Sequence, residues 1–421
     1  MVNLQLPRGT RDLMPNEAIF RNELLKRLEK VIQRFGFTTI DTPSFELLRI
    51  LYAKNAIGED TKLIYELKDE ELGLRYDNTV SLARFISMHP EMPLPFKRYY
   101  IGKAWRREEP QHLRYREFTQ IDADIIGGSE VNADAEIIAL GCKLFDELGI
   151  NYKVQLSDRR IIGEVFKKLG IAEELHINVM RAIDKLDKLS SEEVIKILSD
   201  LKLSSEVIDA LIDFITHKGS NEDKLVYAEG LIGNKQLTDS MRSVLELLDI
   251  YRPKGRIEIE YSTMRGFDYY TGRVFEFKTE ELKETLCGGG RYDNLIKIYS
   301  NREVPAVGFA VGLDRLLDYL SFSDSLKLTY ANVFVACVKD SNHKYGIKVA
   351  NKLRSMGIPT DIDTSEKNLS NQLKYANSLK IPYVIIVGDE EEKQEKVKFR
   401  NLTTGSEVLV GIDEVPKLMK W

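Results

Sequence analysis

The stretch from Lys103 to Gly128, KAWRREEPQHLRYREFTQIDADIIGG, combines side chains that can bind a polyanion and a small cation side by side. Its basic residues, with aromatic residues among them, are Lys103, Arg106, Arg107, Arg114 and Arg116. Guanidinium groups bind phosphate oxygens through paired hydrogen bonds, and an aromatic ring can stack on a base, so this order favours a nucleotide site. The alternative is a solvated loop whose arginines pair with Glu108, Glu109 and Glu117.

The segment EFTQIDADII within this stretch alternates between residues suited to a core and polar or aromatic residues. Successive side chains of a strand point to opposite faces, so the pattern predicts a strand with one face in the core. The other face would carry Phe118, Gln120, Asp122 and Asp124. An aromatic ring, an amide and two carboxylates would then lie in line beside the arginines. The alternative is a half-exposed strand with its polar face in water.

A second candidate for anion binding is Arg315 in the segment VGLDRLL. Gly312 ends an expected strand, and Arg315 falls in the first turn of the next helix. A cation there opposes the helix dipole at a cost of a few tenths to about 1 kcal/mol. A bound anion at the helix N-terminus would remove this cost. The alternative is that the neighbouring Asp314 balances the charge.

Two further segments are dense in hydrogen-bonding groups. TMRGFDYYTGRVFEF brings Arg265, Asp268, Tyr269 and Tyr270 close together, and CGGGRYDNL joins a glycine run to another Arg-Tyr-Asp. The glycine run alone is weak evidence, since it also suits a flexible turn. It lacks the Walker spacing, and no GxGxxG follows a strand, which argues against P-loop and Rossmann sites. For Asp77, the role expected from the residue alone is a helix N-cap.

Composition limits the class of protein. A chain of 421 residues is too long for one ordinary domain, which predicts two or three. The net charge of −5 argues against a protein that coats DNA but leaves room for a local RNA-binding surface. The three cysteines form no CxxC pair, which argues against a disulfide framework or a zinc site and favours a reducing compartment. We expect a cytoplasmic protein, because the apolar runs are too short to span a bilayer and the start shows no secretory signal.

The elements that must position these residues follow from helix and strand patterns. Apolar spacing predicts a helix from Pro15 to Phe35, and residues 74–88 predict a strand, a turn and a helix. KRYYIGKAWRRE and EFTQIDADIIG predict two strands joined by the charged loop. Residues 159–249 are rich in Leu, Ile, Lys and Glu, which predicts a helical insertion, and strands resume at RIEIEYS. After a polar linker at 321–329, alternating patterns predict a C-terminal α/β domain with a mixed sheet.

Together these motifs resemble the histidyl-tRNA synthetases, a family of class II aminoacyl-tRNA synthetases, over essentially the whole chain. RGFDYYTGRVFEF and LCGGGRYDNL look like the two histidine signatures of the family. WRREEPQHLRYREFTQIDADIIG looks like the second class II motif and AVGFAVGLDRLL like the third. The helix from Pro15 and the strand around Pro43 resemble the first motif, which builds the dimer interface. Asp77 and Asp124 stand where bacterial members generally carry glutamate, so the chain resembles archaeal and eukaryotic members.

The resemblance implies a set of ATP-binding residues. Arg106 would hold the α-phosphate and the activated carboxylate. Glu108 would accept a hydrogen bond from the adenine amino group, and Phe118 would stack on the adenine. Arg114 and Arg315 would hold the γ-phosphate.

The resemblance also implies a histidine-binding set, which consists of Asp77, Thr79, Gln120, Asp124, Arg265, Tyr269 and Tyr270. The first three would hold the ammonium and carboxylate groups of the substrate. Asp124 and Tyr270 would read the imidazole, with Tyr269 in the same wall. Arg265 would stand beside the α-phosphate, where related enzymes place a metal ion, and would be catalytic together with Arg106.

The implied fold is α+β, with a class II antiparallel-sheet catalytic domain at 1–158 and 250–325. A helical insertion domain at 159–249 and an α/β anticodon-binding domain at 329–421 complete it. The implied activity is ATP-dependent formation of histidyl-adenylate and transfer to tRNA(His) by a homodimer with Mg²⁺, whose ligands stay open. The alternative is a non-catalytic, synthetase-like regulatory subunit of histidine biosynthesis; such proteins usually lack the anticodon-binding domain and parts of the signatures.

Overall fold

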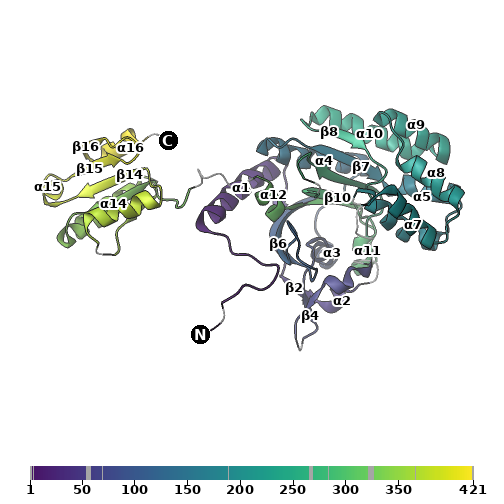
Figure 1. Ribbon diagram of the computed structural model, residues 1–421, viewed down its shortest axis with the longest axis horizontal. Coiled ribbons are helices and arrows are strands. Elements are labelled where there is room, and N and C mark those ends of the chain that lie inside the picture. Colours follow the sequence, from purple (N-terminus) through teal and green to yellow (C-terminus); the bar gives the residue numbers. More distant parts are fainter. Residues whose placement is uncertain are drawn as a thin grey trace. The chain divides into compact units, whose positions relative to one another are not determined.

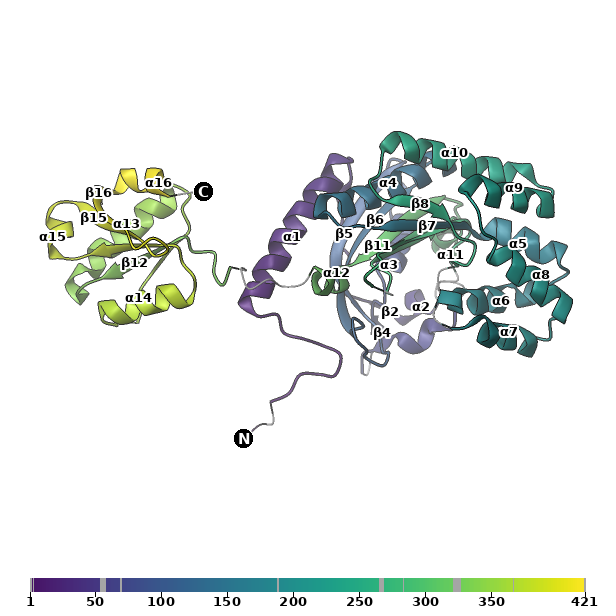
Figure 2. The ribbon, with the colours of Figure 1, turned by 45° about the horizontal axis from the view of Figure 1, so that its top comes forward.

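The computed structural model describes residues 2, 4–53, 58–68, 70–187, 189–264, 269–282, 284–320, 327–365 and 367–419. These residues form two compact units (Figures 1 and 2). Of the described residues, the first unit contains 2, 4–11 and 26–320, and the second contains 12–25 and 327–419. Within the described ranges, no helix is long and apolar enough to cross a membrane.

An eight-stranded sheet organises the first unit. In spatial order its strands are β1 (Thr38–Thr39), β5 (Phe96–Trp105), β6 (Glu117–Ile126), β11 (Ala306–Gly312), β10 (Cys287–Arg291), β9 (Arg273–Lys278), β7 (Lys153–Asp158) and β8 (Arg256–Ile259). All neighbours from β5 to β7 pair antiparallel, whereas the β1–β5 and β7–β8 pairs are parallel. The predicted α+β fold with an antiparallel catalytic sheet is confirmed.

Strands β5 and β6 form the long hairpin that positions the charged stretch. They pair from Phe96 opposite Ile126 to Trp105 opposite Glu117. The second half of β6 is buried on both faces, and Asp122 and Asp124 are only 3% and 2% exposed. The predicted strand and hairpin are therefore confirmed, and the alternative of a polar face in water is wrong for these two carboxylates.

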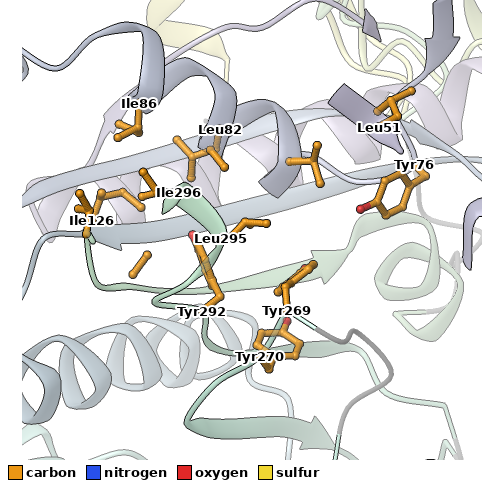
Figure 3. Packing of buried hydrophobic residues seen from close by; sticks show 14 of the residues in the cluster. Leu51, Tyr76, Leu82, Ile86, Ile126, Tyr269, Tyr270, Tyr292, Leu295 and Ile296 are labelled. Carbon is orange, nitrogen blue, oxygen red and sulfur yellow. The ribbon is translucent and has the colours of Figure 1, made fainter. Parts of the chain in front are cut away.

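Helices close the core around the tyrosine-rich segments. α4 (Glu130–Leu148) buries its apolar side chains and ends at Gly149, whose φ of 69° is a left-handed conformation that favours glycine. A separate core cluster joins α3 (Thr79–Met88) and α11 (Leu295–Ser300) to a group of buried tyrosines (Figure 3). These tyrosines are Tyr76, Tyr269, Tyr270 and Tyr292. Packing on two helices thus fixes the rings of Tyr269, Tyr270 and Tyr292, which line the cavity described below.

Smaller elements complete the N-terminal part of the chain. They are α1 (Pro15–Arg34), β2 (Phe45–Leu47), α2 (Leu48–Leu51), the 3₁₀ helix η1 (Gly58–Leu63), β3 (Tyr65–Glu66) and β4 (Leu72–Leu74). The predicted helix from Pro15 is confirmed and ends one residue earlier than expected. The strands form a small sheet in the order β2-β4-β3. α12 (Leu313–Tyr319) follows β11 directly, as the segment VGLDRLL predicted.

Helices occupy the segment for which the sequence predicted them. They are α5 (Arg159–Lys168), η2 (Glu173–Leu175), α6 (His176–Ile183), η3 (Asp184–Asp187), α7 (Ser191–Asp200), α8 (Ser205–Ile215), α9 (Asn221–Ile232) and α10 (Lys235–Tyr251). Ser190 and Ser220 begin α7 and α9 with capping boxes, in which the serine and an acidic residue satisfy each other's backbone donors. The boundaries 159–249 of an insertion domain stay a prediction.

The second unit contains a five-stranded mixed sheet, as predicted. Its strands in spatial order are β13 (Thr360–Ile362), β12 (Val333–Cys337), β14 (Tyr383–Val387), β15 (Lys396–Asn401) and β16 (Glu407–Gly411). The β13–β12 and β12–β14 pairs are parallel, whereas the β14–β15 and β15–β16 pairs are antiparallel. Its helices are η4 (Asp340–Asn342), α13 (His343–Ser355), α14 (Leu369–Ser378), α15 (Asp389–Lys393), η5 (Ile412–Glu414) and α16 (Val415–Leu418). Residues of β12 alternate between two apolar clusters, so both faces of this sheet are covered.

A buried ion network ties α4 to strands β9 and β10. Asp134 on α4 lies with Oδ1 2.6 Å from Arg291 Nη2 and with Oδ2 2.7 Å from Arg273 Nη1. Arg273 Nη1 also lies 2.8 Å from Glu130 Oε1. Both arginines and Asp134 are almost completely buried. Buried charges persist only when they are paired, so each member of this network depends on the others.

Asp134→Asn should leave two buried guanidinium groups without their full negative partner. Removing one member of a buried pair costs about 3–5 kcal/mol, and we expect the free energy of unfolding of the first unit to fall by this amount. Urea titration followed by circular dichroism measures it. Asp239→Asn is the control, because Asp239 pairs with Arg242 at the surface with 52% of its side chain exposed. Losses below about 1 kcal/mol in both variants would contradict the account.

Candidate active site

A cavity of about 170 Å³ lies among β6, β10, β11 and the starts of α3 and α12. Every predicted site residue that the structure describes lines it: Asp77, Thr79, Arg106, Glu108, Arg114, Phe118, Gln120, Asp124, Tyr269, Tyr270 and Arg315. Arg265, the remaining one, lies outside the described residues, as does Asp268. The fold thus brings together segments that are far apart in the sequence.

A larger groove of about 1500 Å³ lies elsewhere, between the α8–α9 connection, α10 and β8. It contains none of the predicted site residues. Its lining mixes cations such as Lys218 and Arg252 with anions such as Glu246 and Glu258. Size alone favours this groove, but the smaller cavity holds the buried carboxylates, arginines and aromatic rings, so we take the smaller cavity as the candidate site.

Asp124 lies in the cavity wall with a partner on each oxygen. The hydroxyl of Tyr292 donates to Oδ1. Nη2 of Arg98 lies 2.8 Å from Oδ2, although the two atoms are out of line for a hydrogen bond. The carboxylate reaches across to β11, where a Cβ on Gly308 would come within 1.9 Å of Asp124 Oδ1. Glycine at 308 is therefore a condition for this position of the carboxylate.

The glycine run CGGGR is strand β10 and not a flexible turn. The whole strand is buried. A Cβ at Gly289 would lie 2.0 Å from the carbonyl oxygen of Gly308, and one at Gly290 would lie 2.8 Å from the ring of Tyr270. The glycines therefore allow β10 to pass close to β11 and to the tyrosine wall.

Asp122 is a second buried carboxylate in the same wall. Its Oδ2 accepts a hydrogen bond of 2.6 Å from Asn78 Nδ2. Its Oδ1 is buried and has no hydrogen-bond partner among the residues that the structure describes. Burial raises the pKa of Asp122 to about 7; the positive charge of Arg98 opposes this shift, and the negative charges of Asp124 and Asp77 add to it.

Asp77 both caps a helix and faces the cavity. Its Oδ1 accepts from the backbone amides of Thr79 and Val80 at the start of α3, each at 3.1 Å. These bonds confirm that Asp77 caps the helix, although the N-cap position itself is the next residue, Asn78. Its Oδ2 accepts from the hydroxyl of Tyr269 over 3.4 Å. One carboxylate thus orders the helix start and presents its other oxygen to the tyrosine wall.

The arginine side of the cavity is held by backbone carbonyls and one ion pair. Arg106 Nε donates to the carbonyl of Tyr76 over 3.1 Å, and its guanidinium lies 5.0 Å from the centre of the Phe118 ring. Arg114 forms an ion pair of 2.6 Å with Glu108. The predicted approach of a guanidinium to Phe118 is confirmed. The alternative, in which arginines pair with neighbouring glutamates, also holds for Arg114 and for Arg116, whose Nη2 lies 3.7 Å from Glu109 Oε1.

Arg315 is anchored at two carbonyl groups. Its Nε donates to Leu113 O and its Nη1 to Thr285 O, each over 3.0 Å. Asp314 instead accepts from the amide of Thr119 over 2.6 Å and pairs with Arg11 at 3.0 Å. Asp314 therefore forms its ion pair with Arg11, and the alternative that it balances the charge of Arg315 in this first turn stays a prediction.

Three residues that build this wall were not among the predicted site residues: Asp122, Tyr292 and Arg98. Asp122 was on the predicted polar face, and Tyr292 was inside the motif CGGGRYDNL, so each had a signal. Arg98 had none, because its place opposite Asp124 depends on the register between β5 and β6.

Comparison with known proteins identifies the family. The family model described as histidyl-tRNA synthetase matches residues 9–316. This chain belongs to the histidyl-tRNA synthetase family. A second family model, described as an anticodon binding domain, matches residues 332–420. The resemblance in the motifs is thereby confirmed.

Relatives of the histidyl-tRNA synthetase family align over almost the full chain. The histidine–tRNA ligase of Korarchaeum cryptofilum is 38% identical over 408 residues, which cover 94% of each chain. That of Aeropyrum pernix is 37% identical, over 98% of this chain and 97% of the relative. The crystal structure of histidyl-tRNA synthetase from Nostoc sp. PCC 7120 aligns over 100% of both chains with a TM-score of 0.86 and 25% identity. A structure from Bacillus halodurans, described as an ATP phosphoribosyltransferase regulatory subunit/histidyl-tRNA synthetase, covers 89% of this chain and 97% of its own with a TM-score of 0.76; at 22% identity it shows a common fold alone.

Asp122 should make stability depend on pH. Its pKa of about 7 in the folded chain lies above the value of about 3.9 for an unfolded chain. Between these values the folded state holds a proton that the unfolded state has lost, so the free energy of unfolding falls as pH rises, by at most about 1.4 kcal/mol per pH unit. Asp122→Asn removes this contribution.

We therefore expect the unfolding free energy of Asp122→Asn, minus that of the wild type, to rise between about pH 5 and about pH 7. Urea titrations of both proteins at the two pH values measure the difference. A difference that stays constant, or falls, would mean that Asp122 is already ionised at the lower pH.

Proposed function

We propose that the chain activates L-histidine with ATP to form histidyl-adenylate and then transfers the histidyl group to tRNA(His). The observation that carries the proposal is one cavity that combines Arg106 and Arg315 with Asp124 and Tyr270. Basic and aromatic groups suit a nucleotide, whereas carboxylate and phenol groups suit an imidazole ring. Relatives named histidine–tRNA ligase support the same activity.

In this proposal ATP lies along the arginine side of the cavity. Phe118 stacks on the adenine, and Glu108 accepts a hydrogen bond from its amino group. Arg106 holds the α-phosphate, and Arg114 and Arg315 hold the γ-phosphate. Because Arg114 is paired with Glu108 at 2.6 Å, ATP must replace this ion pair on binding. The γ-phosphate then pairs with the guanidinium of Arg114, and the adenine amino group donates a hydrogen bond to the carboxylate of Glu108.

Histidine lies on the carboxylate and tyrosine side. The residues proposed to bind it are Asp77, Thr79, Gln120, Asp124, Arg265, Tyr269 and Tyr270. Asp124 and Tyr270 satisfy the two ring nitrogens, and Tyr269 lines the same wall. An amino acid with an apolar side chain would offer no hydrogen-bond donor to the buried carboxylate of Asp124. Sites of this kind reject analogues by roughly 10⁴–10⁵-fold.

The chemistry needs positioning and charge more than a reactive side chain. In the first step a carboxylate oxygen of histidine attacks the α-phosphorus, the bond to the bridging oxygen breaks, and pyrophosphate leaves. Two anions must meet, so the fixed charges of Arg106 and Arg265 stabilise the charge that develops. Holding both reactants in line can remove roughly 7–11 kcal/mol of barrier. In the second step the terminal ribose hydroxyl of the tRNA attacks the acyl carbon, and AMP leaves.

Magnesium would enter with the nucleotide. Among the residues that the structure describes, no three His, Cys, Asp or Glu side chains are grouped to hold a metal. Mg²⁺ in nucleotide sites is usually bound by substrate phosphates and waters with one or two carboxylates. We therefore assign it no dedicated set of ligands here. A cytoplasmic homodimer, whose C-terminal unit binds the tRNA anticodon, completes the proposal.

A non-catalytic regulatory subunit of histidine biosynthesis is the alternative, and one assay separates the two. Exchange of labelled pyrophosphate into ATP is measured with each of the twenty amino acids. We expect exchange with histidine alone. Exchange with another amino acid would change the substrate within the class, and no exchange with any amino acid would favour the regulatory subunit.

Asp124→Ala should abolish recognition of histidine. A hydrogen bond from the imidazole to a charged carboxylate is worth about 1.5–3 kcal/mol, which corresponds to a loss of at least about 10-fold in histidine-dependent exchange. Binding of ATP should persist, since Asp124 is not among the residues proposed to bind it. Asp239→Ala, at the surface of α10, is the control for both measurements. Exchange at the wild-type rate in a folded Asp124→Ala protein would refute the assignment.

A further inference from the structure

Asp122 lies between two proposed histidine-binding residues but has no role in the mechanism above. On β6 the side chains of Gln120, Asp122 and Asp124 point to the same face, and all three line the cavity. Asp122 is 3% exposed. A carboxylate at this depth requires a partner, because its lost hydration is costly.

The two oxygens of Asp122 differ in how they are satisfied. Oδ2 accepts from Asn78 Nδ2 over 2.6 Å, whereas Oδ1 has no hydrogen-bond partner among the described residues. Oε1 of Gln120, the next side chain on this face, is also buried without a partner among them. Unsatisfied buried acceptors cost about 1–3 kcal/mol each, more when charged. Two neighbouring acceptors of this kind point to a ligand that brings N–H or O–H donors.

The local charges favour a cation. Asp77, Asp122 and Asp124 are three carboxylates in the wall, and Arg98 pairs with Asp124 at 2.8 Å. The charge of Arg106 acts on Asp77. No ion pair among the described residues includes Asp122; burial raises its pKa to about 7, and the nearby charge of Arg98 opposes this shift only in part. A ligand cation beside Asp122 would supply the missing counter-charge.

The α-ammonium of an amino acid fits this position better than an imidazole does. An ammonium carries a full positive charge and three N–H donors. Three side chains that line the cavity carry acceptors for these donors: Asp77 Oδ2, Gln120 Oε1 and Asp122 Oδ1. The ring belongs farther along β6 at Asp124, whose carboxylate Tyr292 and Arg98 already hold in place.

We propose that Asp122 is a substrate-binding residue, whose Oδ1 accepts a hydrogen bond from the α-ammonium of the amino acid and balances its charge. The inference rests on the proposed function and adds a second carboxylate, besides Asp77, to the ammonium subsite. Asn78 is then a positioning residue, because its bond to Oδ2 turns Oδ1 toward the cavity.

Two analogues separate the ammonium from the ring. L-Histidinol has the ammonium and the imidazole, whereas imidazole-4-propionate has the imidazole and a carboxylate but no ammonium. Their dissociation constants are measured by calorimetry on the full-length wild type and on Asp122→Asn. We expect Asp122→Asn to weaken histidinol by roughly 10- to 100-fold, the value of a charged hydrogen bond. Imidazole-4-propionate and ATP should change by less than about 2-fold.

Asp124→Asn is the matched control, since it removes the same charge from the same face of β6. It should weaken both imidazole ligands, because both present the ring. Asp122→Ser places a smaller neutral acceptor at the same position. It should change the dissociation constants of the two analogues as Asp122→Asn does, and it replaces Asp122→Asn if that variant does not fold.

Equal losses for both analogues in the Asp122 variants would place the ring at Asp122 and overturn the inference. Unchanged affinity for histidinol would leave Asp122 with a structural role only and would also overturn it. In either case histidine-dependent exchange by the wild type would still support the proposed function. A wild type that binds neither analogue and shows no exchange with histidine would overturn both.

Discussion

Negative charge buried on one face of β6 is the constraint on which the rest of the structure depends. Asp122 and Asp124 are almost completely buried, and such carboxylates are stable only with partners that replace their hydration. β5 supplies Arg98 to Asp124, and the start of α3 supplies Asn78 to Asp122. β11 leaves space for the Asp124 carboxylate at Gly308. The order and register of these strands are what allow a sheet core to hold charged groups beside a ligand.

A second layer of polar contacts supports the first. Arg291 directly precedes Tyr292, so the ion pairs of Arg291 with Asp134 fix the backbone from which Tyr292 reaches Asp124. Arg273, which shares Asp134, also donates to Ser240 on α10. The helical segment and the cavity wall therefore rest on the same network. A substitution of Asp134 would therefore disturb both the helical segment and the cavity wall, although Asp134 itself does not line the cavity.

The sequence could predict the parts of the site that local patterns determine. Strand alternation is local, so it placed Gln120 and Asp124 on one face of β6, and helical spacing located α1 and α3. Pairing between distant segments is not local: Asp314 stands next to Arg315 in the sequence, yet it pairs with Arg11. Arg98 likewise meets Asp124 only through the β5–β6 register. For glycines 288–290 a flexible turn stayed open because glycine has low strand preference, and the close packing of Gly289 against β11 overrides that preference.

The central claim is that one cavity holds ATP and histidine together, with the polar face of β6 as their common wall. A crystal structure with ATP and the unreactive analogue L-histidinol tests it most directly. The account predicts the imidazole in contact with Asp124 and Tyr270 and the triphosphate between Arg106 and Arg315. Histidinol bound outside this cavity, for example in the groove between α10 and β8, or a triphosphate away from both arginines, would contradict it.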